Sequence, residues 1–306
     1  MALRITRAAD PITVDRLNVV VYGPPGLGKT SLAFTAEAPL LLDFDNGSHR
    51  AAGRKDVVRV ASWSDVVGIT QEDLAPYSTI VIDTAGRALD AITADIIKTD
   101  PKGHKNGSLT LPGYGTLKSR FTGFMKLMNS FGKDVVLIAH MDEQRNGDDV
   151  IERLDVQGGS KGEIYKAADA MGRLVMEGGK RYLKFSPADA AFGKNPGQLE
   201  PLLVPHNDAT EFDDFLARII AGTKDRLNAM SEDQKAAKQA QDALREALAG
   251  ASDAVGINAL LDQAKAAGPV AKSMLHARAT ELGMVFDKAA GAYAVKPAEG
   301  NQQDAA

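Results

Sequence analysis

The sequence contains no cysteine among its 306 residues. Disulfide bonds, thiolate metal sites and cysteine nucleophiles are therefore excluded, and the composition fits a reducing cytosol. No apolar run approaches the roughly 18 residues that a membrane span requires. Residues 1–17 also lack the apolar core of a signal peptide. We therefore expect a cytoplasmic protein with no membrane partner.

An excess of positive charge is absent as well. The formal net charge is −4, from 36 Lys and Arg against 40 Asp and Glu. This balance excludes binding to nucleic acid by bulk charge and leaves room for a local basic patch. With 44% hydrophobic and 25% charged residues, the composition is that of a globular protein. The length suits one large domain, or one domain with a small appendage.

Short apolar runs alternate with longer mixed segments up to about residue 190. Continuous apolar strands separated by helical segments are typical of a mostly parallel sheet covered by helices on both faces, so we expect an α/β fold. Residues 115–131 have helical apolar spacing. The expected strands are residues 17–22, 40–43, 56–60, 78–83 and 134–140, followed by a hairpin at 172–179 and 181–187.

The residue pattern changes after about residue 210, where Ala-rich helical segments begin. We expect one amphipathic helix over 211–222 and a second over 231–250, the latter capped by Ser231. Two short helices separated at Gly268-Pro269 follow. The predicted division is a core of residues 1–222, a C-terminal helical appendage of residues 223–290 and a disordered tail of residues 291–306.

The stretch GPPGLGKT at residues 23–30 matches the phosphate-loop pattern G-x-x-x-x-G-K-[ST] in full, between a predicted strand and a predicted helix. Small residues let backbone N–H groups surround a phosphate, and the helix N-terminus adds the positive end of its dipole. We expect Lys29 to reach the β- and γ-phosphates of ATP and Thr30 to bind Mg²⁺. The predicted nucleotide-binding residues are Gly23, Pro24, Pro25, Gly26, Leu27, Gly28, Lys29, Thr30 and Ser31.

Asp83 ends the apolar run TIVID and is the second predicted Mg²⁺ ligand, directly or through water. The alternative for this residue is a cap on the following helix. A ring-forming AAA+ protein normally carries Glu directly after this aspartate, to activate the attacking water. Here Thr84 follows, so the acid must come from another strand or hydrolysis is feeble.

The segment LLLDFDNG supplies two acids, Asp43 and Asp45, at the end of a predicted strand. Alternation along a strand puts both on one side, and the carboxyl ends of such strands face the ligand crevice. We predict Asp45 as the general base, with Asp43 as the second candidate. A solvated acidic turn at Asn46-Gly47 is the alternative.

His140 ends the apolar run DVVLIAH. A polar residue at the tip of a strand beside the phosphate-loop strand can contact the γ-phosphate and change position on hydrolysis. His140 is therefore our predicted sensor, and a hydrogen-bonded structural histidine is the alternative.

The order of these motifs over residues 15–205 resembles the core of RecA-type ATPases, in the compact phage form associated with single-strand annealing and recombination. The resemblance implies that the acid two residues beyond the second strand, here Asp45, is catalytic. It implies a hydroxyl residue after the metal-site Asp83, and a sensor at His140. It also implies that Lys194, in the late GKN element, reaches a neighbouring subunit's phosphate, and hence a homo-oligomer, either ring or filament.

The same resemblance implies two DNA-facing segments. Residues 101–120 contain four cations, an aromatic residue and no acid, and a flexible basic segment of this kind suits backbone neutralisation with base stacking. A solvated loop is the alternative. In residues 141–169 the contact would be near QGGSKG. The predicted DNA-binding residues are Lys102, Lys105, Tyr114, Lys118, Arg120 and Lys161.

We therefore expect a Mg²⁺-dependent ATPase, stimulated by single-stranded DNA, that anneals or pairs strands in phage recombination or replication inside a bacterial host cell. A single-strand-binding or replication protein is an expected partner. One alternative is an AAA+-type remodelling or helicase-loader ATPase, suggested by GPPGLGKT, whose lid arginine could only be Arg278. Another is a small-molecule or nucleotide kinase. A kinase is expected to have an arginine-rich lid, and only Arg145 and Arg153 are candidates for it.

Overall fold

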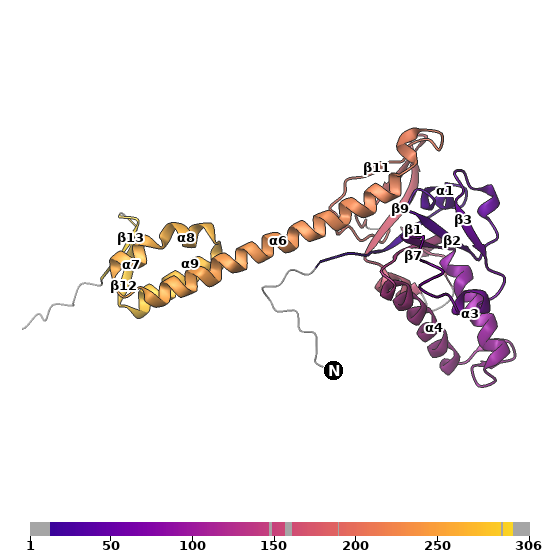
Figure 1. The fold of residues 1–306 in the computed structure, drawn as a ribbon, viewed down its shortest axis with the longest axis horizontal. Coiled ribbons are helices and arrows are strands. Elements are labelled where there is room, and N and C mark those ends of the chain that lie inside the picture. The colour runs from indigo at the N-terminus through magenta and orange to yellow at the C-terminus, as the bar shows by residue number, and fades with distance from the viewer. Residues whose placement is uncertain (1–12, 147–148, 157–160, 189, 289, 296–306) are drawn as a thin grey trace, which may run out of the picture. The chain divides into compact units, whose positions relative to one another are not determined.

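The computed structural model describes residues 13–146, 149–156, 161–188, 190–288 and 290–295. Two compact units divide the chain between Leu227 and Asn228. The first unit holds the sheet and the helices around it, and the second begins within the long helix α6 (Figure 1). The predicted boundary at residue 222 thus falls five residues before the observed division.

A nine-stranded sheet forms the centre of the first unit, in the order β11-β10-β9-β1-β7-β4-β2-β3, with β8 paired to β7. The strands from β9 to β3 in this order run parallel to their neighbours, whereas β10, β11 and β8 pair in antiparallel fashion. The predicted mostly parallel α/β fold is confirmed. The strands are β1 (Asn18–Gly23), β2 (Pro39–Asp43), β3 (Asp56–Arg59), β4 (Thr79–Asp83), β7 (Asp134–Asn146), β8 (Asp149–Leu154), β9 (Ala170–Glu177), β10 (Lys180–Lys184) and β11 (Leu202–Leu203).

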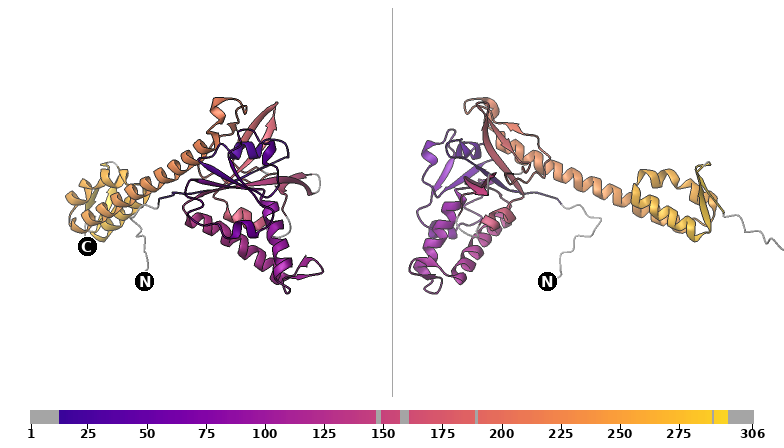
Figure 2. Two further views of the ribbon diagram at one scale, coloured as in Figure 1. Left: turned by 45° about the vertical axis from the view of Figure 1, so that its right-hand side comes forward. Right: turned by 180° about the vertical axis from the view of Figure 1, so that it is seen from behind.

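Helices cover both faces of this sheet (Figure 2). Side chains alternate along each strand, so Val20 of β1 packs in the core beneath α3 and α4, whereas Val19 and Val21 pack toward α1 and the first turns of α6. None of the helices in the described ranges is both long and apolar enough to cross a membrane. The helices of this unit are α1 (Lys29–Ala33), α2 (Ser64–Val67), α3 (Ala85–Thr99), α4 (Leu111–Ser130), α5 (Lys161–Ala167) and the start of α6 (Phe215–Gly250).

Residues 101–120 differ from the flexible loop that the sequence predicted. Strands β5 (His104–Lys105) and β6 (Ser108–Leu109) form a hairpin. Its turn is Asn106-Gly107, both with positive φ, as tight hairpin turns require. Helix α4 then begins at Leu111 rather than 115, because the Thr110 hydroxyl caps it by accepting from the N–H of Gly113.

The second unit combines helices with a β-hairpin. After α6 come α7 (Ala254–Ala259), α8 (Leu261–Ala266), α9 (Pro269–Glu281), β12 (Met284–Asp287) and β13 (Ala292–Val295). Helix α6 is continuous over 36 residues, so the two separate helices predicted over 211–250 are one. The disordered tail predicted from residue 291 is wrong for β13, because Tyr293 is buried and exchanges hydrogen bonds with Asn258. Residues 296–306 lie outside the described residues.

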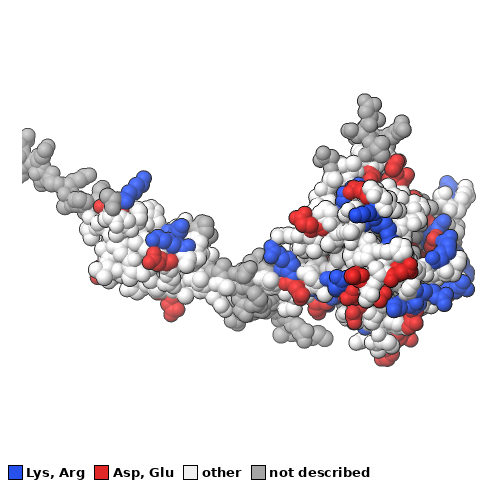
Figure 3. All heavy atoms as spheres, turned by 90° about the horizontal axis from the view of Figure 1, so that it is seen from above, with Lys and Arg blue, Asp and Glu red and all other residues white. Residues whose placement is uncertain are grey.

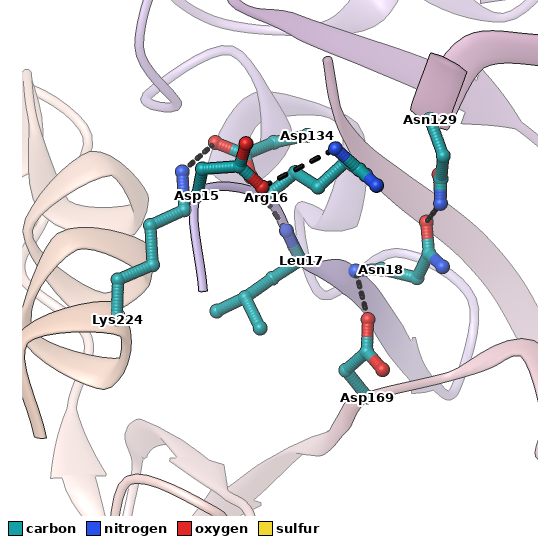
Figure 4. Close-up of polar contacts among 8 residues, drawn as sticks. All are labelled: Asp15, Arg16, Leu17, Asn18, Asn129, Asp134, Asp169 and Lys224. Atoms are coloured by element: carbon teal, nitrogen blue, oxygen red, sulfur yellow. Dashed lines mark hydrogen bonds and ion pairs between the residues drawn. The ribbon is translucent and has the colours of Figure 1, made fainter. Parts of the chain in front are cut away.

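Polar contacts join several elements at the amino-terminal end of the parallel strands (Figure 4). The buried carboxylate of Asp134 accepts one hydrogen bond from the Leu17 N–H and one from the Lys224 ammonium of α6, each at 2.7 Å. On the other side, Asp169 accepts from the N–H of Asn18 at 2.8 Å. These contacts hold the start of β1, the start of β7 and helix α6 together.

A second connection to α6 comes from the residue that follows the first helix. The Thr35 hydroxyl accepts a hydrogen bond from the N–H of Leu216 at 2.9 Å, and the Thr35 carbonyl accepts from the N–H of Ala217 at 3.0 Å. Two otherwise unpaired donors in the first turn of α6 are satisfied in this way.

Candidate nucleotide-binding site

The phosphate loop joins the carboxyl end of β1 to helix α1. Gly26 and Gly28 adopt φ values of 82° and 84°, in the left-handed region that favours glycine. At Gly28 an added Cβ would also lie 2.9 Å from Nη1 of Arg181. The two glycines therefore meet a backbone requirement, and a larger residue at Gly28 would also displace the end of the Arg181 side chain.

Lys29 is the first residue of α1, and its side chain folds back over the loop. The ammonium donates to the carbonyls of Gly23 and Pro24, both at 2.9 Å. Lys29 is only 6% exposed, and burial lowers the pKa of its ammonium to about 8, although the carboxylates of Asp83 and Asp45 act in the opposite direction. A buried cation of this kind is stabilised by a bound anion such as a phosphate.

Thr30 and Asp83 meet on the other side of the loop. The Thr30 hydroxyl donates to the Asp83 carboxylate at 2.7 Å. Burial raises the pKa of Asp83 to about 6, and the bond from Thr30 opposes that shift. A hydroxyl beside a dehydrated carboxylate fits Mg²⁺, which takes one or two protein oxygens and otherwise water and phosphate oxygens.

The two acids after β2 have different surroundings. Asp43 is fully buried, and its carboxylate accepts from the N–H groups of Gly47 and Ser48 at 3.1 Å each. Asp43 therefore holds the turn, which makes it a structural residue rather than the second candidate base. Asp45 is anchored by its N–H to the Asp83 carbonyl at 3.2 Å. Its carboxylate lies 3.4 Å from Nε of Arg87 on α3.

One cavity of about 350 Å³ gathers most of the predicted nucleotide residues. It opens at the carboxyl ends of β1, β2 and β4, where ligands bind in open α/β sheets, and beside Ile138 and His140 in the middle of β7. Asp45, Asp83 and His140 lie around the phosphate loop in this cavity. Its lining is Pro25, Gly26, Gly28, Lys29, Thr30, Ser31, Asp45, Gly47, Arg50, Ala51, Asp83, Ile138 and His140.

His140 lies on β7 directly opposite Gly23 of β1, so the predicted neighbouring strand is confirmed. Burial lowers the pKa of His140, and the Lys29 ammonium acts in the same direction. The imidazole is therefore neutral at pH 7. Its buried Nδ1 has no hydrogen-bond partner among the described residues.

Lys194 lies outside this cavity. Its ammonium donates to the carbonyls of Tyr165 and Ala168, both at 2.6 Å, at the end of α5 in its own chain. Cations at this position satisfy the last carbonyls of a helix. The predicted reach of Lys194 to a neighbouring phosphate stays a prediction, and it requires release from these two carbonyls.

The predicted DNA-binding residues fall into three groups. Lys118 pairs with Glu163 at 2.9 Å, and Arg120 pairs with Asp95. Lys102, Lys105 and Tyr114 are exposed. Lys161 is the first residue of α5, and the preceding residues 157–160 lie outside the described residues.

Sequence reasoning missed two arginines at the site. Arg87 pairs with Asp45, as described above. Arg181 on β10 donates to the carbonyl of Leu27 in the phosphate loop at 3.3 Å and to the Asn207 side chain at 2.8 Å. Burial lowers the pKa of Arg181. Neither arginine belongs to a motif, and tertiary packing alone brings Arg87 to Asp45 and Arg181 to the phosphate loop.

This site defines a P-loop nucleotide-binding protein. The chain belongs to the AAA domain family, whose model matches residues 15–196. No curated protein matches the chain. Among solved structures it is similar to a KaiC-like protein from the hyperthermophilic archaeon Pyrococcus horikoshii OT3, with 11% identity and a TM-score of 0.33 over 55% of this chain and 76% of that chain. The expected P-loop ATPase class is confirmed, and the phage recombination role stays a prediction.

Proposed function

We propose that the protein is a Mg²⁺-dependent ATPase stimulated by single-stranded DNA, acting in annealing or strand pairing during phage recombination or replication. The observation that supports hydrolysis is the convergence of Lys29, Thr30, Asp83 and Asp45 on one cavity. The DNA substrate is supported by the resemblance to RecA-type ATPases and by the exposed cations Lys102 and Lys105.

The residues divide the work of hydrolysis among them. Lys29 neutralises charge on the β- and γ-phosphates, while Thr30 and Asp83 would hold Mg²⁺, which would supply further charge neutralisation there. Asp45 accepts a proton from the attacking water as the water oxygen bonds to the γ-phosphorus and ADP leaves with the bridging oxygen. Arg87 orients the Asp45 carboxylate, and neutral His140 is placed to donate or accept a hydrogen bond at the γ-phosphate.

The proposed function is tested by phosphate release from ATP with and without single-stranded DNA. We expect the DNA to accelerate hydrolysis several-fold. Acceleration by a protein and not by DNA would instead support an AAA+-type remodelling or loader ATPase, which the family match also permits. Transfer of the γ-phosphate to a small acceptor in place of water would support a kinase.

Replacing Asp45 with Asn tests the proposed general base. Loss of a positioned base costs about 10²- to 10⁴-fold in rate, so we expect hydrolysis to fall by that order while a fluorescent ATP analogue still binds. Asp43→Asn is the matched control, and it should lower thermal stability because Asp43 holds the turn at Gly47 and Ser48. Hydrolysis at the wild-type rate in Asp45→Asn would remove Asp45 from the mechanism.

A further inference from the structure

A basic surface that sequence analysis did not assign to any function lies at the sheet edge that ends in β3. We call it the β3 basic edge, and it consists of Arg50, Arg54, Lys55 and Arg59, all exposed. Residues 49–60 contain these four cations and one carboxylate, Asp56, which accepts a hydrogen bond from the Tyr77 hydroxyl at 2.8 Å. This density of positive charge contrasts with the net charge of −4 of the chain.

The cations of the β3 basic edge have no carboxylate partner among the described residues. In the segment that the sequence predicted for DNA, by contrast, Lys118 and Arg120 are neutralised by Glu163 and Asp95. Unpaired cations keep their full capacity to replace the counterions of a phosphate backbone. The β3 basic edge therefore offers four such cations, whereas residues 101–120 offer two, Lys102 and Lys105.

The position of this surface connects it to the nucleotide cavity. Strand β3 is the last strand of the sheet on its side, and Arg50 itself lines the cavity. From Lys55 to Arg59 the strand rises about 13 Å, enough to face several phosphates of one strand. In Figure 3, Lys and Arg side chains gather on the side of the first unit where Figure 1 draws β3.

We propose that the β3 basic edge binds the phosphate backbone of a nucleic acid strand beside the nucleotide cavity, an inference that rests on the proposed function. A guanidinium group can donate two parallel hydrogen bonds to the oxygens of one phosphate, and three of the four cations are arginines. No large apolar side chain is exposed between residues 46 and 60, whereas protein interfaces have an apolar centre. A phosphate backbone thus fits this surface better than an acidic protein does.

The chemistry of the surface also sets its specificity. Residues 46–60 include no Phe, Tyr or Trp for base stacking. Contacts limited to phosphates carry no sequence information, so binding here is independent of sequence and strongly salt-dependent.

Protection of an edge strand is the other established use of such cations, because charged side chains prevent pairing with another sheet. That explanation covers Arg59, which lies on β3. It does not cover Arg50 and Arg54, which precede the strand.

The experiment measures anisotropy of a labelled oligothymidylate at several salt concentrations. The test variant is Arg54→Gln/Lys55→Gln, which leaves Arg50 in the cavity untouched. The matched control is Lys98→Gln/Lys126→Gln, which removes the same charge from two exposed lysines of α3 and α4 that have no assigned role in DNA binding. We expect the test variant to bind about tenfold or more weakly, with a salt slope lower by about 2, since each phosphate contact contributes about 1. The control and the DNA-free ATPase rates should stay at the wild-type level.

Each other outcome has a separate meaning. Unchanged binding in the test variant with loss in the control overturns the inference and leaves the proposed function standing. Equal losses in both variants indicate bulk charge and also overturn it. No DNA binding by the wild type contradicts the proposed function itself. If the β3 basic edge binds polyglutamate and not DNA, its partner is an acidic protein, and the inference is overturned.

Discussion

Replacing Lys29 with methionine is expected to lower the rate of ATP hydrolysis by about 10²- to 10³-fold, the usual loss for one preorganised donor to a developing charge. The carbonyls of Gly23 and Pro24 hold the ammonium at the phosphate loop. Methionine keeps most of the side-chain volume and removes the charge. The loss should therefore appear in both nucleotide affinity and turnover, measured by analogue binding and phosphate release.

The same variant should be at least as stable as the wild type without nucleotide. Burial holds the pKa of Lys29 at about 8, below its ordinary value, so the folded state disfavours the ammonium at neutral pH. That cost is fully present below pH 8, falls as the pH rises from about 8 toward the ordinary lysine pKa of 10.5, and is absent above it. Thermal melting checks this, with the exposed Lys126→Met as control. ATP should raise the Tm of the Lys126→Met control and leave that of Lys29→Met unchanged. A large drop in the Tm of Lys29→Met without nucleotide would instead show that Lys29 is mainly structural.

Replacing Asp134 with alanine is expected to lower the free energy of unfolding by about 3–5 kcal/mol, the cost of removing one partner of a buried ion pair. The change leaves the N–H of Leu17 and the ammonium of Lys224 without their acceptor. Urea unfolding can be followed through Trp63, the single tryptophan of the chain, which is buried in the core of the first unit. The signal thus reports on that unit.

Asp208→Ala provides the contrast. Asp208 pairs with His206 at the surface, where its side chain is 88% exposed, and exposed pairs contribute about 0–1 kcal/mol. We expect its unfolding midpoint to stay near that of the wild type. Equal midpoints for the Asp134 and Asp208 variants would mean that the contacts in Figure 4 do not stabilise the fold.

Local pattern and spacing were sufficient for the phosphate loop, Asp83, the strands β1 to β4, the first half of β7, the β9–β10 hairpin and the place of His140 beside β1. In each case the residues that decide the structure are neighbours in sequence. Asp43 and Asp45 illustrate the limit of prediction from local pattern. Alternation places both side chains on one side of β2, but it cannot show which carboxylate accepts hydrogen bonds from the N–H groups of Gly47 and Ser48.

Charge counts along the chain cannot show which cations are paired, for a related reason. Lys118 and Arg120 are cations in an acid-free segment, yet α3 and α5 bring carboxylates to them from residues 95 and 163. Arg54 and Lys55 follow no motif, and only the structure shows them without such partners. Tyr293 lies in a polar C-terminal stretch, and its hydrogen bonds to Asn258 bridge 35 residues.

Thr35 connects the phosphate loop to helix α6 through hydrogen bonds. The loop leads into α1, α1 ends just before Thr35, and Thr35 holds the N–H groups of Leu216 and Ala217. Any displacement of α1 on nucleotide binding must carry the start of α6 with it or break two hydrogen bonds, each worth about 1 kcal/mol. Thr35 thus connects the helix that follows the phosphate loop to the first turn of α6.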